Sequence, residues 1–152
     1  MLEFKLGQLC HPQVLQLLHE HLDDMQATSP PESKHALDVE SLKEPSIRFW
    51  TAWDGDTLAG CGAYQKLDEH HAELKSMRTS SKHKNKGVAS SLLENLINQA
   101  RKDGMKRLSL ETGSMDYFKP ARNFYQKHGF NYCSPFANYT NDPNSRFMYL
   151  DI

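Results

Sequence analysis

Hydrophobic and polar positions along the chain change their period several times, and each change predicts an element of secondary structure. Apolar residues recur at helical spacing from Pro12 to Met25 and again from Val88 to Ala100, and a third helix is predicted over Ala121–His128. Alternation at a period of two, bounded by turn residues, predicts strands instead. The predicted strands are Phe4–Leu6, Ile47–Trp53, Leu58–Lys66, His71–Thr79, Arg107–Glu111, Phe130–Cys133 and Arg146–Leu150, and a short helix is predicted over Ala36–Leu42.

The order of these elements predicts a single α/β domain over residues 1–152. A turn at Asp54–Asp56 joins two antiparallel strands as a hairpin. The helix that begins at Val88 lies between strands His71–Thr79 and Arg107–Glu111, which predicts a right-handed parallel crossover. The expected sheet is therefore mixed and mostly antiparallel, with one parallel pair and helices on both faces.

Composition narrows the function classes. The 18 basic and 19 acidic residues nearly balance, so the chain as a whole is not typical of a protein that coats nucleic acid or a membrane. Cys10, Cys61 and Cys133 have no metal-ligand spacing and cannot all pair within one chain. They favour a reducing, cytoplasmic location, and the sequence has neither a secretory h-region at its N-terminus nor an apolar run of transmembrane length.

A basic turn with one glycine leads directly into the second long helix. The first turn of a helix leaves backbone N–H groups unpaired and carries the positive end of the helix dipole, so it attracts anions. Gly87 lets a ligand approach the backbone, and Ala89, Ser90 and Ser91 keep the helix start free of bulk. The four basic side chains are Lys82, His83, Lys84 and Lys86. We interpret this turn as a cradle for a diphosphate; the alternative is an ordinary helix start with solvated lysines.

The spacing of the turn matches neither the dinucleotide fingerprint nor the P-loop. It resembles the Arg/Gln-x-x-Gly-x-Gly/Ala signature of the GNAT superfamily of acyl-CoA-dependent N-acetyltransferases, with Lys84, Gly87 and Ala89 at the three positions. Lys84 keeps the charge of the usual Arg but lacks its planar fork. Ala121–Phe130 resembles the superfamily's Ala-x-x-Leu-Tyr-x-x-x-Gly-Phe segment, whereas Phe118 stands where an Asn is often found. The phrases at 29–33, 110–113 and 142–145 also resemble a subgroup of small bacterial members.

The resemblance implies that strand His71–Thr79 and the parallel strand beside it splay apart. The pantetheine arm of acetyl-CoA would enter between them. Backbone groups of Met77, Arg78 and Thr79 would bond the pantetheine, and those of Lys86, Gly87, Val88, Ala89 and Ser90 would hold the diphosphate. The implied partners are acetyl-CoA as co-substrate and an amine acceptor, without metal, nucleic acid or membrane; a homodimer is allowed.

The resemblance also implies catalytic roles. Tyr125 matches a family tyrosine whose hydroxyl lies near the sulfur, and a phenol can protonate a departing thiolate. The alternative is a core aromatic beside Phe124. The backbone N–H of Arg78 would stabilise the oxyanion.

Glu73 is the candidate base, because it precedes Lys84 by eleven residues, the separation at which some superfamily members carry a carboxylate base. Water as the base, with Glu73 in a surface pair with Lys75, is an equal alternative, and Glu111 is held in reserve. Strand alternation predicts one face made of Glu73, Lys75, Met77 and Thr79 and another made of Leu74, Ser76 and Arg78.

The leading hypothesis is transfer of an acetyl group from acetyl-CoA to a primary amine of a small molecule, amino acid or peptide. The alternatives are an acyl-CoA-binding sensor and a nucleic-acid binder that uses the lysines of the turn. A Cys–His nucleophile at Cys61 or Cys133 has no local signature. His11, His19, His21 and Asp23 are spread around the first helix, which favours a solvated surface over a metal site.

Overall fold

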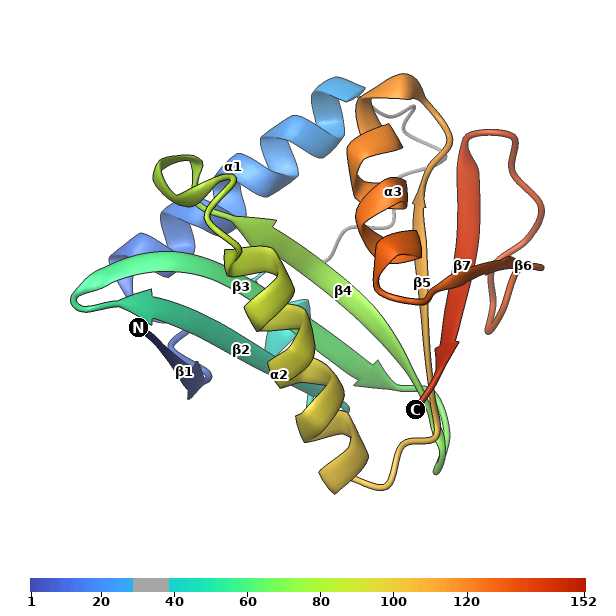
Figure 1. The fold of residues 1–152 in the computed structure, drawn as a ribbon, viewed down its shortest axis with the longest axis horizontal. Helices are drawn as coiled ribbons and strands as arrows, with labels where there is room; N and C mark the ends of the chain where they lie inside the picture. Colours follow the sequence, from blue (N-terminus) through green and yellow to red (C-terminus); the bar gives the residue numbers. More distant parts are fainter. Residues whose placement is uncertain (29–38) are drawn as a thin grey trace.

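The computed structural model describes residues 1–28 and 39–152, and its elements follow the predicted order (Figure 1). The helices are α1 (Pro12–Thr28), α2 (Val88–Lys102) and α3 (Lys119–Lys127), with 3-10 turns at Ser41–Lys43, Ser81–His83 and Asp116–Phe118. The strands are β1 (Leu2–Leu6), β2 (Ile47–Asp54), β3 (Thr57–Lys66), β4 (His71–Thr79), β5 (Arg107–Gly113), β6 (Asn131–Cys133) and β7 (Ser145–Asp151). Residues 36–38 of the predicted helix Ala36–Leu42 lie outside the described residues, and its described end meets the 3-10 turn Ser41–Lys43.

The strands form one sheet in the order β1-β2-β3-β4-β5-β7-β6. The β4–β5 pair is parallel, and the other neighbouring pairs in the described residues are antiparallel. The predicted fold class, a mostly antiparallel mixed sheet with one parallel pair, is confirmed.

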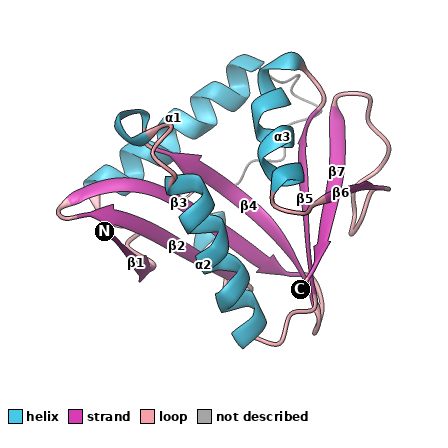
Figure 2. Cartoon of the chain, viewed as in Figure 1, coloured by secondary structure: helices cyan, strands magenta, loops and turns pink. Residues whose placement is uncertain are grey.

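Helices cover both faces of the sheet, and each face has its own hydrophobic core (Figure 2). Burying one Leu side chain contributes about 1.5–3 kcal/mol, so the apolar stripe of α2 is enough to hold it on the sheet. That stripe consists of Val88, Leu92, Leu93, Leu96 and Ala100. On the opposite face α1 buries Val14, Leu17 and Leu18. None of the described helices is long and apolar enough to cross a membrane.

Two glycines in β3 allow the sheet to bend beside β4. A Cβ at Gly60 would lie 2.9 Å from the carbonyl oxygen of Arg78, so the two backbones approach closely there. A Cβ at Gly62 would lie 2.5 Å from the sulfur of Met77, and the β3–β4 register shifts around this residue. The two glycines of β3 therefore allow β4 to approach closely.

Candidate active site

The parallel strands β4 and β5 pair only at their beginnings, through His71 to Glu73 of β4. Beyond Glu73 the strands diverge, as Figure 2 shows. Between them lies a cavity of about 160 Å³, lined by residues of β4, β5, α1, α3 and the segment that joins β6 to β7. Backbone groups on the two facing edges lose their strand partners there, so a ligand with amide groups could bond them.

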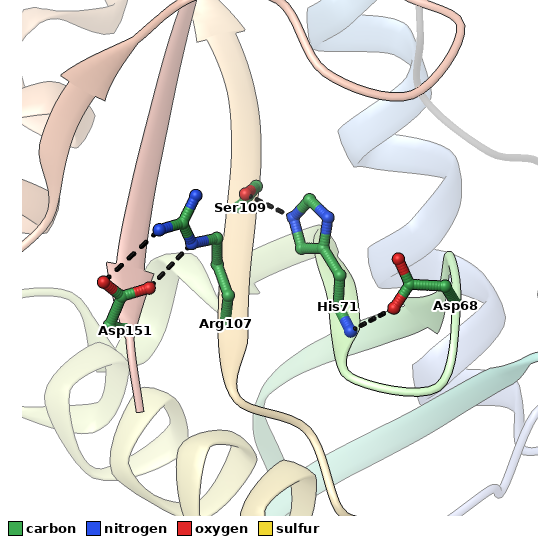
Figure 3. A network of polar contacts seen from close by, with 5 residues as sticks. All are labelled: Asp68, His71, Arg107, Ser109 and Asp151. Atoms are coloured by element: carbon green, nitrogen blue, oxygen red, sulfur yellow. Dashed lines mark hydrogen bonds and ion pairs between the residues drawn. The ribbon is translucent and has the colours of Figure 1, made fainter.

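The paired end of the two strands is fixed by polar contacts (Figure 3). His71 Nε2 lies 2.6 Å from the hydroxyl of buried Ser109 on β5, and Asp68 accepts the backbone N–H of His71 at 2.8 Å. Arg107 binds Asp151 at 2.7 Å across the β5–β7 pair. These contacts fix the point from which β4 and β5 diverge.

A bulge in β4 makes the predicted face alternation wrong. Ser76 has a left-handed backbone with φ of 58°, which inserts a step into the alternation. Met77 therefore packs with Leu74 against the α2 core, whereas Arg78 reaches α1 and binds Asp24 at 2.6 Å. Lys75 and Met77 do not share a face.

Glu73 is buried in the cavity wall, with 4% of its surface exposed. Its Oε2 atom lies 3.2 Å from Nζ of Lys75 and accepts a 2.5 Å hydrogen bond from the hydroxyl of Tyr139. The predicted pair with Lys75 exists, but it lies inside the cavity and not on the surface. The sequence assigns no role to Tyr139, because its segment has no recognisable pattern.

Tyr125 lines the same cavity from α3. Its ring packs against Phe124 and Phe130 at centroid distances of 5.2 and 5.5 Å, and burial raises the pKa of its hydroxyl above the ordinary value. No described residue forms a hydrogen bond with that hydroxyl. The two candidate catalytic residues, Glu73 and Tyr125, thus face one cavity from opposite elements.

The basic turn ends at Gly87, which caps α2 in a left-handed conformation with φ of 79°. Apart from its chain neighbours, no atom of the described residues lies within 4 Å of where its Cβ would stand, so the approach to the helix start is open. Lys84 and Lys86 are exposed beside it, and Ser90 contacts His128 at 3.0 Å. This geometry fits an anionic ligand held by backbone N–H groups and exposed ammonium groups.

One of the four basic side chains of the turn points away from the lysines. His83 is buried and turns toward Asp54 of the β2–β3 hairpin, with 3.3 Å between Nε2 and the carboxylate. The prediction that it gathers with the lysines is wrong, because the 3-10 turn Ser81–His83 points its side chain inward.

The first-helix histidines differ from one another. His19 and Asp23 are exposed, as predicted, but His21 lines the cavity. Desolvation and the nearby Arg78 charge lower the pKa of His21 to about 4, so its ring is neutral at physiological pH. Among the described residues no cluster of three His, Cys, Asp or Glu side chains is arranged to hold a metal.

The environment of Cys61 argues against the Cys–His alternative. The thiol is fully buried, burial raises its pKa to about 12, and its Sγ lies 3.4 Å from the carbonyl oxygen of Ser76. It therefore stays protonated at neutral pH and is a poor nucleophile.

A splayed parallel strand pair, flanked by a glycine-capped helix start, defines the acyltransferase fold that the sequence resembles. The model of the Acetyltransferase (GNAT) family matches residues 14–130, and the chain belongs to this family. It is 55% identical to the uncharacterised N-acetyltransferase YsnE of Bacillus subtilis over 97% of both chains. It is 46% identical to the uncharacterised N-acetyltransferase YedL of Escherichia coli, over 100% of this chain and 96% of the relative.

A third relative has a named activity, and solved structures share the fold. An IAA acetyltransferase of Azospirillum brasilense is 35% identical over 90% of this chain and 86% of its own length. Among solved structures, a GNAT acetyltransferase of Staphylococcus aureus matches with a TM-score of 0.77 at 17% identity, over 99% of both chains. An acetyltransferase of Bacillus subtilis in complex with CoA matches with a TM-score of 0.74 at 22% identity, over 100% of this chain and 99% of that one.

Proposed function

We propose that the protein transfers an acetyl group from acetyl-CoA to the primary amine of a small molecule, amino acid or peptide by direct attack. The observation that carries this proposal is that Glu73 and Tyr125 line one cavity between the splayed strands. One residue is acidic and paired with a cation; the other is a buried phenol. This is the set of groups that amine acylation needs on either side of the reacting carbon.

In the proposed site, acetyl-CoA is bound mostly by backbone groups. The edge of β4 from Met77 to Thr79 would bond the pantetheine amides, and the N–H groups from Lys86 to Ser90 would hold the diphosphate, with Lys84 beside it. The open space around Gly87 and the exposed lysines support this assignment. Acetyl-CoA-dependent chemistry is typical of the family to which the chain belongs.

In the proposed reaction the amine nitrogen attacks the thioester carbonyl carbon, and the carbon–sulfur bond breaks. Glu73 takes the proton that the amine loses, and Lys75 lies 3.2 Å from its carboxylate. Tyr125 gives its proton to the departing thiolate, and the backbone N–H of Arg78 stabilises the oxyanion. Protons and charge balance when Glu73 releases the proton of the amine to solvent and Tyr125 recovers its own proton from solvent.

A thiol-release screen tests the proposal. The protein is incubated with acetyl-CoA and a panel of amines, amino acids, short peptides and IAA, and free CoA thiol is measured. Release that depends on one class of primary amine is the expected result. Binding of CoA in calorimetry without release by any acceptor would indicate an acyl-CoA sensor instead, and absence of CoA binding would refute the proposed site.

A further inference from the structure

The Glu73–Lys75 ion pair lies inside the cavity, where it has little reason to exist for stability alone. The two side chains are 5% and 11% exposed, and both line the space between β4 and β5. A buried ion pair adds little net stability, because the loss of hydration offsets most of the attraction. A role in binding a ligand explains its position better.

Each member of the pair has bonding capacity left over. An ammonium group has three N–H donors, and Lys75 uses two, on Glu73 and on the hydroxyl of Tyr139 at 3.3 Å. The contacts of Glu73 with Lys75 and Tyr139 both fall on Oε2, and no residue in the described ranges donates to Oε1. One acceptor atom and one charged donor therefore remain side by side.

The proposed reaction changes the charge of this pair. When Glu73 takes a proton from the amine it becomes neutral, and the ammonium of Lys75 loses the counter-charge that lies 3.2 Å away. An unpaired buried ammonium is unfavourable. A carboxylate carried by the acceptor would replace the missing negative charge at the moment it is lost.

We infer that the acceptor is a free α-amino acid, whose amine meets Oε1 of Glu73 and whose carboxylate meets Nζ of Lys75. This inference rests on the proposed N-acetyl transfer. The charged groups of the pair are 3.2 Å apart, which suits an amine and a carboxylate on the same carbon and excludes a distant side-chain amine. A peptide N-terminus lacks the adjacent carboxylate. Tyr139 is a positioning residue that holds both charged groups through one neutral hydroxyl.

The ratio of kcat/KM for an amino acid to kcat/KM for its amide tests this inference. Thiol release from acetyl-CoA is measured with the twenty protein amino acids, their amides and the corresponding amines without a carboxylate. For the best amino acid we expect kcat/KM to exceed that of its amide by about 10- to 100-fold, the usual size of one charge-assisted contact. Lys75→Met should bring this ratio close to one, and Lys75→Arg should keep much of it. Lys102→Met, an exposed cation in the last turn of α2, is the control and should leave the ratio unchanged.

The outcomes separate this inference from the function on which it rests. Amides or simple amines that react as well as amino acids overturn the inference and leave N-acetyl transfer intact. An unchanged ratio in Lys75→Met also overturns the inference and leaves N-acetyl transfer intact. If that variant does not fold, the ratio measured for the wild type and for Lys75→Arg tests the inference instead. A protein that binds CoA but releases thiol with none of these acceptors overturns both.

Discussion

Replacing Tyr125 by Phe removes one hydroxyl and keeps the ring. The ring contacts with Phe124 and Phe130 stay in place, and no described residue loses a hydrogen-bond partner. Because the hydroxyl faces the cavity and has no hydrogen-bond partner among the described residues, its removal should change the free energy of unfolding by less than about 1 kcal/mol. The variant therefore isolates the chemistry of the hydroxyl from the packing of α3.

The expected effect falls on the chemical step. Burial raises the pKa of Tyr125 above its ordinary value near 10, so the hydroxyl stays protonated throughout the physiological range and is available as an acid. A positioned general acid contributes about 10²–10⁴-fold, and the variant should slow by that factor, or about 3–5 kcal/mol in the barrier. The affinity for CoA should not change, because the hydroxyl acts only when the thiolate departs.

Single-turnover kinetics beside a CoA titration and denaturant unfolding measure the three quantities separately. Tyr117→Phe is the matched control, since Tyr117 is 55% exposed and should lose nothing. A folded Tyr125→Phe protein with the wild-type rate would refute the argument, and it would leave Tyr125 as a core aromatic and solvent as the acid. Equal losses of affinity and rate would instead indicate damaged packing around Phe124.

Three further substitutions probe the other parts of the site. Gly87→Glu should abolish CoA binding in calorimetry while the fold survives. Gly55→Glu, at another open glycine with positive φ, is the control and should bind CoA normally. Equal CoA affinities of the two variants would mean that the cradle is misplaced. Glu73→Gln should lower the rate most at low pH, where acceptor amines are mostly protonated, and a pH–rate profile identical to wild type would leave water as the base. Gly113→Ala would collide with the ring of Phe118, so chemical unfolding should show a loss of about 1–3 kcal/mol; an unchanged stability would mean that the ring moves freely.

The fold could be predicted because its signals are local. The alternation that defines β4 gave the same bounds that the structure has, and the apolar stripe of α2 contains the residues that the helix buries. The error within β4 came from one residue. Ser76 adopts a left-handed backbone conformation. A glycine at this position would have suggested such a conformation, but a serine does not, so the alternation beyond it could not be predicted correctly.

The two sides of the site differ in how far a sequence can reveal them. A diphosphate cradle consists of backbone N–H groups in one continuous turn, so its glycine and small residues form a pattern that is visible at Gly87. The acceptor side instead joins side chains from α1, β4, β5 and the segment before β7; the contact between Tyr139 and Glu73 spans 66 positions. No spacing encodes such a meeting, because it depends on how the strands diverge and where the segment returns. In the proposed site the residues on the acceptor side can therefore change without altering the cradle, which is why the sequence predicts the donor more directly than the acceptor.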